Sequence, residues 1–124
     1  MFNFSGKRPD NLGVKDGKLA PCPGTPNCVN SQSQDPKSKI EPLPPVAIAD
    51  LKKAIKSMER TKIIEETDNY LYAEFKSNIM GYVDDVEFYL DPNENVLHVR
   101  SASRLGQSDL GVNRKRIEAI RAKL

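Results

Sequence analysis

The sequence predicts an α+β domain: a four-stranded antiparallel sheet with two helices on one face, preceded by a Pro-rich N-terminal arm. Three patterns indicate this fold. Four consecutive runs are strand-like, and the last three of them alternate between apolar and polar residues. Short turn-forming links join successive runs, and one helical pattern precedes the runs while another follows them. We therefore expect the order α-β-β-β-β-α, and 124 residues leave room for a single core.

The first third of the chain is rich in proline. Eight of the nine prolines and four of the seven glycines fall before residue 46. Proline fixes φ and removes a hydrogen-bond donor, which excludes long helices and central strands from this segment. We expect a flexible tail over residues 1–18 and a single domain over residues 19–124, in which residues 19–45 form the arm that carries both cysteines.

Two stretches have the three- and four-residue spacing of amphipathic helices. The first begins just after two consecutive prolines at 44–45, and the second ends the chain. Their apolar positions are Ile48, Leu51, Ala54, Ile55 and Met58 in the first, and Ile117, Ile120 and Leu124 in the second.

The four predicted strands cover residues 61–67, 70–77, 82–90 and 96–102. Side chains alternate between the two faces of a strand, so one face of the sheet should be apolar and the other polar. We expect both helices to pack on the face that carries Leu71, Phe75, Phe88 and Val99. The short links at 68–69 and 91–95 are typical of hairpins and favour antiparallel pairing.

Composition and charge limit the partners. Hydrophobic residues make up 38% of the chain and charged residues 29%, no apolar run could span a membrane, and no apolar leader is visible, so we expect a cytoplasmic protein. The net charge is +2, but residues 46–99 carry −5 and residues 100–124 carry +5. These regions either neutralise each other or form an anion-binding surface. No nucleic-acid motif is present, so no such partner is predicted.

The cysteines bound a short string, Cys-Pro-Gly-Thr-Pro-Asn-Cys at 22–28. We expect Cys22 and Cys28 to lie close enough to bridge. A structural disulfide, inert thiols, and redox or intermolecular metal chemistry all remain open. An intrachain structural zinc needs four ligands, whereas the chain offers two cysteines and one histidine. No metal site and no cofactor is predicted.

A polar site is predicted on two neighbouring strands. Asp85 and Glu87 share one face of a strand and follow Asp84, while His98 and Arg100 share the corresponding face one hairpin away. Close carboxylates can raise one another's pKa, bind a cation or pair with bases. Glu74 and Lys76 of the preceding strand extend the patch. The structural alternative is a water-facing sheet surface with cross-strand charge pairs.

The segment between the last strand and the last helix adds Arg104, Asp109, Asn113 and Arg114. A helix N-terminus with nearby arginines can bind an anion. Alternatively, Asp109 caps the helix and the arginines pair with the acidic strand. In either case we expect the acidic strand and the basic turn to converge in one polar network.

Three strings together resemble a known family. They are Cys-Pro-Gly-Thr-Pro-Asn-Cys-Val-Asn-Ser-Gln at 22–32, Val-Asp-Asp-Val-Glu-Phe-Tyr-Leu at 83–90, and Val-Arg-Ser-Ala-Ser-Arg-Leu-Gly-Gln-Ser-Asp-Leu-Gly-Val-Asn-Arg at 99–114. The set resembles the bacterial and plastid proteins grouped as domain of unknown function 1499, in particular the short cyanobacterial members. The resemblance runs from about Leu19 to the C-terminus and implies kinship without an activity. Many such relatives are exported or lipid-anchored, a setting that would oxidise the cysteine pair, whereas no leader is visible in this chain.

Two functions from different classes follow from these residues. The first is a non-enzymatic binding module that uses the polar sheet face and the Arg-rich turn to hold an anionic small molecule or a protein partner. The alternative is a small hydrolase- or isomerase-like enzyme, with Asp85 or Glu87 and His98 as acid and base and with Arg100 or Arg104 as electrophile. An open polar face favours the binding module, and a face roofed by the arm favours the enzyme.

Overall fold

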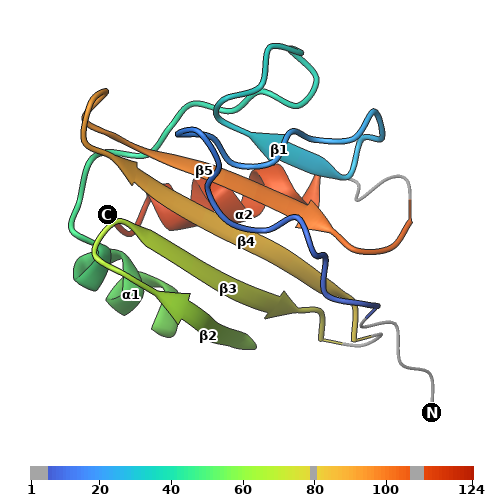
Figure 1. The fold of residues 1–124 in the computed structure, drawn as a ribbon. Helices are drawn as coiled ribbons and strands as arrows, with labels where there is room; N and C mark the ends of the chain where they lie inside the picture. The colour runs from blue at the N-terminus through green and yellow to red at the C-terminus, as the bar shows by residue number, and fades with distance from the viewer. Residues whose placement is uncertain (1–5, 79–80, 107–110) are drawn as a thin grey trace.

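A computed structural model of the chain describes residues 6–78, 81–106 and 111–124. Within these ranges one antiparallel sheet has the strand order β1-β5-β4-β3-β2, and two helices flank it (Figure 1). The elements in chain order are β1 (Cys28–Asn30), α1 (Ile48–Lys56), β2 (Thr61–Glu66), β3 (Tyr70–Lys76), β4 (Val83–Asp91), β5 (Val96–Ser103) and α2 (Val112–Arg121). The α+β class is confirmed.

The prediction of four strands is wrong, because β1 adds a fifth strand at the edge of the sheet. It pairs antiparallel with β5, so that Cys28 lies opposite Ala102 and Asn30 lies opposite Arg100. A run of three residues is too short to show alternation, and most strands have five or six residues. Pairing with β5 makes this segment a strand, and it brings the arm to the edge of the sheet.

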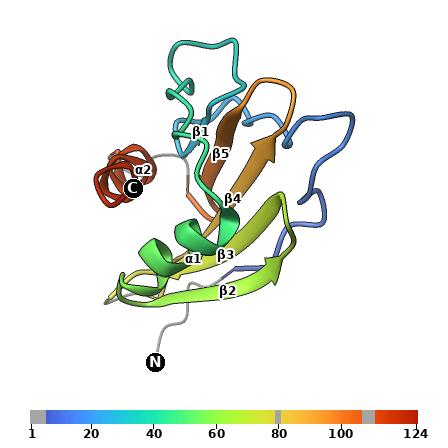
Figure 2. The ribbon, with the colours of Figure 1, turned by 90° about the vertical axis from the view of Figure 1, so that its left-hand side faces the viewer.

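Both helices pack on one face of the sheet, as expected (Figure 2). Each helix contributes two fully buried side chains to the core, Leu51 and Ile55 from α1 and Ile117 and Ile120 from α2. The core on this face also contains Leu71, Ala73, Phe75, Val86, Phe88, Leu97 and Val99. Gly111, whose φ of 80° lies in the left-handed region, turns the chain into α2. Neither described helix is long and apolar enough to cross a membrane.

Residues 6–22, which we call the arm from here on, cross the opposite face of the sheet (Figures 1 and 2). There Leu19 packs with Tyr70, Tyr72 and Tyr89 in a second, smaller apolar cluster, and Leu12 and Val14 pack against it. The polar face of the sheet is therefore roofed by the arm. Segment 6–18, for which we predict a flexible tail, takes part in this roof, and its mobility in solution stays a prediction.

Candidate functional site

The residues predicted to form one site lie on both faces of the sheet. Side chains alternate along β4, so Asp85 and Glu87 point toward the arm while Asp84 points toward the helices. Glu87 lies opposite Arg100 of β5, on the arm-covered face. The structure thus brings Asp85, Glu87 and Arg100 to one face and places Asp84 behind them.

Arg104 connects two carboxylates beneath the arm. Its Nε and Nη2 donate to the two oxygens of Asp85, each at 2.9 Å, and Nη2 also donates to Glu74 Oε2 at 2.6 Å. The Tyr72 hydroxyl donates to the same Asp85 carboxylate, and Arg8 of the arm donates to Glu74 at 2.6 Å. The side chains of Arg104 and Asp85 are only 7% and 1% exposed. A bidentate pair of this kind fixes both the charge and the geometry.

The electrostatics of this cluster favour its ionised form. Hydrogen bonding to Asp85 raises the pKa of Arg104 above its usual range. Burial pushes the pKa of Glu74 upward, but the hydrogen bonds from Arg8 and Arg104 outweigh burial and leave that pKa below its usual value. A lowered carboxylate pKa means that the stabilisation is present at neutral pH and is lost as the pH falls through the lowered value.

Glu87 and Arg100 are both buried under the arm and lie opposite each other on β4 and β5, without a direct ion pair between these two described residues. Glu87 is 0% exposed, and its Oε2 accepts hydrogen bonds from the Tyr70 hydroxyl at 2.5 Å and from the Gly13 amide at 2.7 Å. Arg100 donates through Nη2 to Pro21 O at 3.3 Å. Among the described residues, Glu87 Oε1 and Arg100 Nε have no hydrogen-bond partner. Burial raises the pKa of Glu87 and lowers that of Arg100, so neither charge is fully compensated.

We expect Glu87 to make the fold less stable as the pH rises. In the unfolded chain a glutamate titrates near 4.5, whereas the pKa of Glu87 is raised in the fold. Between these two values the folded chain binds more protons, so the free energy of unfolding falls as the pH rises. Urea unfolding from about pH 4 to 8 should show this fall in the wild type and its loss in Glu87→Gln. Parallel curves for the two proteins would contradict it, and Glu41→Gln, at an exposed position, should follow the wild type.

A separate polar cluster lies on the helix-covered face. Arg116 pairs with Asp84 at 2.7 Å, and its guanidinium lies over the Phe75 ring, 5.0 Å from the centroid. Its Nη1 donates to Asn113 Oδ1 at 2.8 Å, and the Asn113 amide donates to Ser103 Oγ at 3.0 Å. Sequence reasoning singled out Asp84 and Asn113 but missed Arg116. Its position three residues after Asn113, on the same helix face, was the available signal.

The remaining predicted residues have separate surroundings. Arg114 donates to the backbone carbonyls of Lys39 and Lys37 and thereby holds the segment that follows β1 against α2. His98 contacts Ser31 and Glu94 near the β4–β5 hairpin. Asp109 lies outside the described residues. The described residues of the predicted site are thus distributed over the two faces of the sheet, the β4–β5 hairpin and α2.

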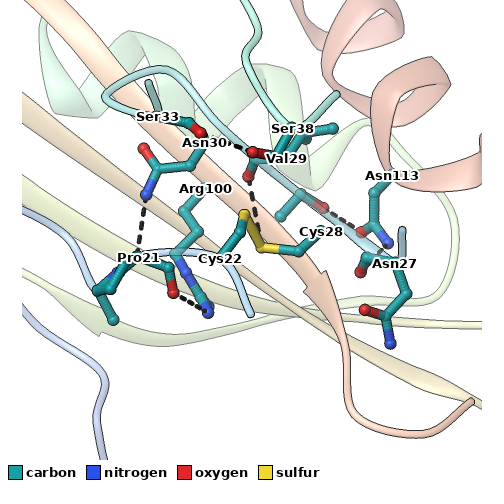
Figure 3. The surroundings of a disulfide bond; sticks show 12 residues. Pro21, Cys22, Asn27, Cys28, Val29, Asn30, Ser33, Ser38, Arg100 and Asn113 are labelled. Carbon is teal, nitrogen blue, oxygen red and sulfur yellow. Dashed lines mark hydrogen bonds between the residues drawn. A yellow bond between two sulfur atoms is a disulfide. The ribbon is translucent and has the colours of Figure 1, made fainter. Parts of the chain in front are cut away.

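Cys22 and Cys28 form a disulfide that joins the arm to β1 (Figure 3). Their Cα atoms are 5.6 Å apart, within the range for a bridge, so the expected proximity is confirmed. Figure 3 shows Arg100 beside the bridge, with its guanidinium directed at the Pro21 carbonyl. Because both sulfurs are in the bond, the inert-thiol interpretation is wrong for this state. Disulfides are typical of non-reducing compartments, and the cytoplasmic location stays a prediction.

A hollow opens where β3, β4 and β5 meet the start of α2. We call it the end hollow; its volume is about 470 Å³. Three large apolar side chains are exposed in the described part of the chain, and Tyr82, Leu105 and Val112 all line this hollow. Its other lining residues are Glu59, Arg60, Phe75, Lys76, Ser77, Val83, Asp84, Ser103, Gly106 and Arg116.

A second hollow adjoins the first, with Arg60, Lys76 and Val83 lining both. We call it the basic hollow, and its volume is about 500 Å³. Its further lining residues are Arg8, Thr61, Lys62, Glu74 and Arg104. Together the two hollows are lined by six arginines and lysines and by three carboxylates, which gives this end of the sheet a positive surface.

The fold and these clusters define a two-layer α+β domain with a disulfide-anchored arm over a buried charge network. A family model described as "Protein of unknown function (DUF1499)" matches residues 18–124. The chain therefore belongs to the DUF1499 family, and the resemblance of its three strings is confirmed. Neither the curated proteins nor the solved structures include a significant match to the chain.

Proposed function

We propose that this protein is a binding module for a small amphipathic anion, held in the end hollow. The observation that carries the proposal is the gathering of Tyr82, Leu105 and Val112, each more than 40% exposed, around one hollow. Exposed apolar side chains that gather in one place on a domain surface often mark a binding site. A volume of about 470 Å³ lies within the range of small-molecule sites.

The charges around the hollow favour an anion. Arg116 is paired with Asp84, and Arg60 is paired with Glu59. Lys76 makes no ion pair with the described residues, so its ammonium group adds an uncompensated positive charge between the end hollow and the basic hollow. An anionic head group at Lys76 would leave an attached apolar body in contact with the three exposed apolar side chains.

The floor of the hollow is held in place before any ligand binds. The Arg116 guanidinium lies over the Phe75 ring and pairs with the Asp84 carboxylate. It also donates a hydrogen bond to Asn113 Oδ1. A preformed site avoids the entropic cost of ordering side chains on binding. Of the described residues that follow β5, Leu105 and Gly106 line the end hollow, and Arg104 lines the adjoining basic hollow.

The acid–base alternative has less support. The arm roofs the polar face, which by itself favours an enzyme, and the pKa of Glu87 is raised by burial. However, Asp85, Glu87 and His98 line none of the four hollows identified among the described residues. Glu87 and His98 also hydrogen-bond to different partners. None of these four hollows therefore gives a substrate direct access to an acid–base pair made of Asp85 or Glu87 and His98.

Titration with decanoate tests the proposal. We expect saturable binding by calorimetry, and no binding of decyltrimethylammonium, which carries a comparable chain and the opposite charge. Val112→Asp should weaken decanoate binding at least about tenfold, because it adds a negative charge to the hollow. An acidic residue in the first turn of α2 favours the helix, so this variant should stay folded.

Lys76→Ala provides a milder test at the rim. We expect it to weaken decanoate binding by about fivefold, corresponding to the loss of one solvent-exposed charge contact. Lys53→Ala, at an exposed position of α1, is the matched control and should bind as the wild type does. Equal affinity for the cationic amphiphile, or unchanged affinity in Val112→Asp, would refute the proposal.

A further inference from the structure

A group of potential metal ligands lies at the β4–β5 hairpin, away from both hollows. Asp91 ends β4, Glu94 lies in the turn, and His98 follows in β5. One ligand atom from each residue lies within 4.8 Å of the other two. Asp91 and His98 are buried, whereas the Glu94 side chain is 63% exposed. Asp91 and His98 therefore form the buried side of this group, and solvent reaches it at Glu94.

The imidazole is held in the orientation that a metal ligand requires. The buried Ser31 hydroxyl lies 2.9 Å from His98 Nδ1 and accepts a hydrogen bond from the Val99 amide at 2.9 Å. Nε2 consequently faces the hairpin carboxylates, 2.9 Å from Glu94 Oε1. A hydroxyl can either donate to Nδ1 or accept from it. It therefore permits the tautomer in which Nδ1 carries the proton and Nε2 offers its lone pair, the arrangement common in metal sites.

The Asp91 carboxylate is also fixed in position. Its Oδ1 accepts hydrogen bonds from the backbone amides of Asn93, at 2.8 Å, and of Glu94, at 3.3 Å. Asp91 also lines an open hollow of about 570 Å³, which gives ions a route to the carboxylate. The exposed Glu94 side chain has the most freedom to adjust as the three groups close around an ion.

We propose that Asp91, Glu94 and His98 bind one divalent transition-metal ion of the zinc type, with solvent completing its coordination. One imidazole nitrogen and two carboxylate oxygens suit zinc, whereas calcium and magnesium prefer oxygen ligands alone. This site is independent of the end hollow. It also differs from the four-ligand structural zinc considered for the cysteines, because three protein ligands and water suffice for an open site.

The composition of the chain makes the test specific. His98 is its one histidine, and Cys22 and Cys28 are joined in a disulfide, so the usual competing nitrogen and sulfur ligands are absent. Using protein without a histidine tag, we expect calorimetry with zinc chloride to give one equivalent of bound zinc. In ¹⁵N-labelled protein the same addition should shift the Nε2 resonance of the single imidazole. Magnesium should produce neither effect.

Two variants distinguish this site from general binding to surface carboxylates. Glu94→Gln should weaken zinc binding at least about tenfold. Because Glu94 is exposed, this variant should fold normally, which keeps the test valid even if His98→Asn disturbs the contact with Ser31. Glu41→Gln, an exposed carboxylate elsewhere, should leave the affinity unchanged. Absence of zinc binding, or equal affinity in Glu94→Gln and the wild type, would overturn the proposal.

Discussion

Replacing Arg104 by alanine is expected to lower the free energy of unfolding by about 3–5 kcal/mol, the usual cost of removing one partner of a buried ion pair. Arg104 bridges Asp85 and Glu74 beneath the arm, and the Asp85 side chain is only 1% exposed. Without Arg104, the Asp85 carboxylate would stay buried with the Tyr72 hydroxyl as its main remaining donor. Urea unfolding at neutral pH measures the loss.

Three variants separate this effect from a general loss of surface charge. Arg104→Lys keeps the charge but lacks the planar fork whose two nitrogens contact the two Asp85 oxygens, so it should be intermediate. Asp85→Asn combined with Arg104→Ala should recover part of the loss, because no charge is then buried alone. Arg60→Ala removes an exposed pair with Glu59 and should cost no more than about 1 kcal/mol. A similarly small loss in Arg104→Ala would show that the cluster contributes little to stability.

Removing the disulfide is expected to cost about 2–3 kcal/mol, because closing a short loop removes less entropy from the unfolded chain than closing a long one. The bridge joins residues whose sequence separation is 6. The bridge also holds Cys22 and the adjacent Pro21 in position, and the Pro21 carbonyl accepts the hydrogen bond from Arg100. The double variant Cys22→Ser/Cys28→Ser, compared with the wild type by urea unfolding, measures the difference.

Reduction gives an independent check on the same bond. Adding a reductant should lower the stability of the wild type to about that of the double serine variant and should leave the variant unchanged. Amide hydrogen exchange should then increase first around Cys22 and Gly13, where the arm crosses the polar face. Equal stability with and without reductant would mean that the bridge does not constrain the arm.

Much of the fold was predictable because the alternation of apolar and polar residues along a strand indicates which of its faces packs against the core. Phe88 and Val99 alternate with Glu87 and Arg100, and this alternation indicates both the apolar face and the cross-strand position of the charges. Because side chains alternate along a strand, the neighbouring residues Asp84 and Asp85 must point to opposite faces of the sheet. Asp84 accordingly pairs with Arg116 on the helix-covered face and Asp85 with Arg104 on the arm-covered face, although both were assigned to the predicted site.

What remained unpredictable depends on contacts between distant segments. β1 is a strand because β5 offers it an edge, and three residues carry no pattern of their own. The arm covers the polar face through contacts such as that of the Gly13 amide with Glu87, and a Pro-rich sequence does not specify where it will lie. The end hollow likewise combines Tyr82, Leu105 and Val112 from separate segments.

Mapping the decanoate contacts by NMR tests the central claim most directly. In a titration of ¹⁵N-labelled protein, the amides of Lys76, Tyr82, Leu105 and Val112 should shift together and saturate with one affinity. The amides of the arm, such as that of Leu19, should stay in place. Shifts centred on the arm, or no saturable shifts at the end hollow, would contradict the assignment of a binding function to this part of the molecule.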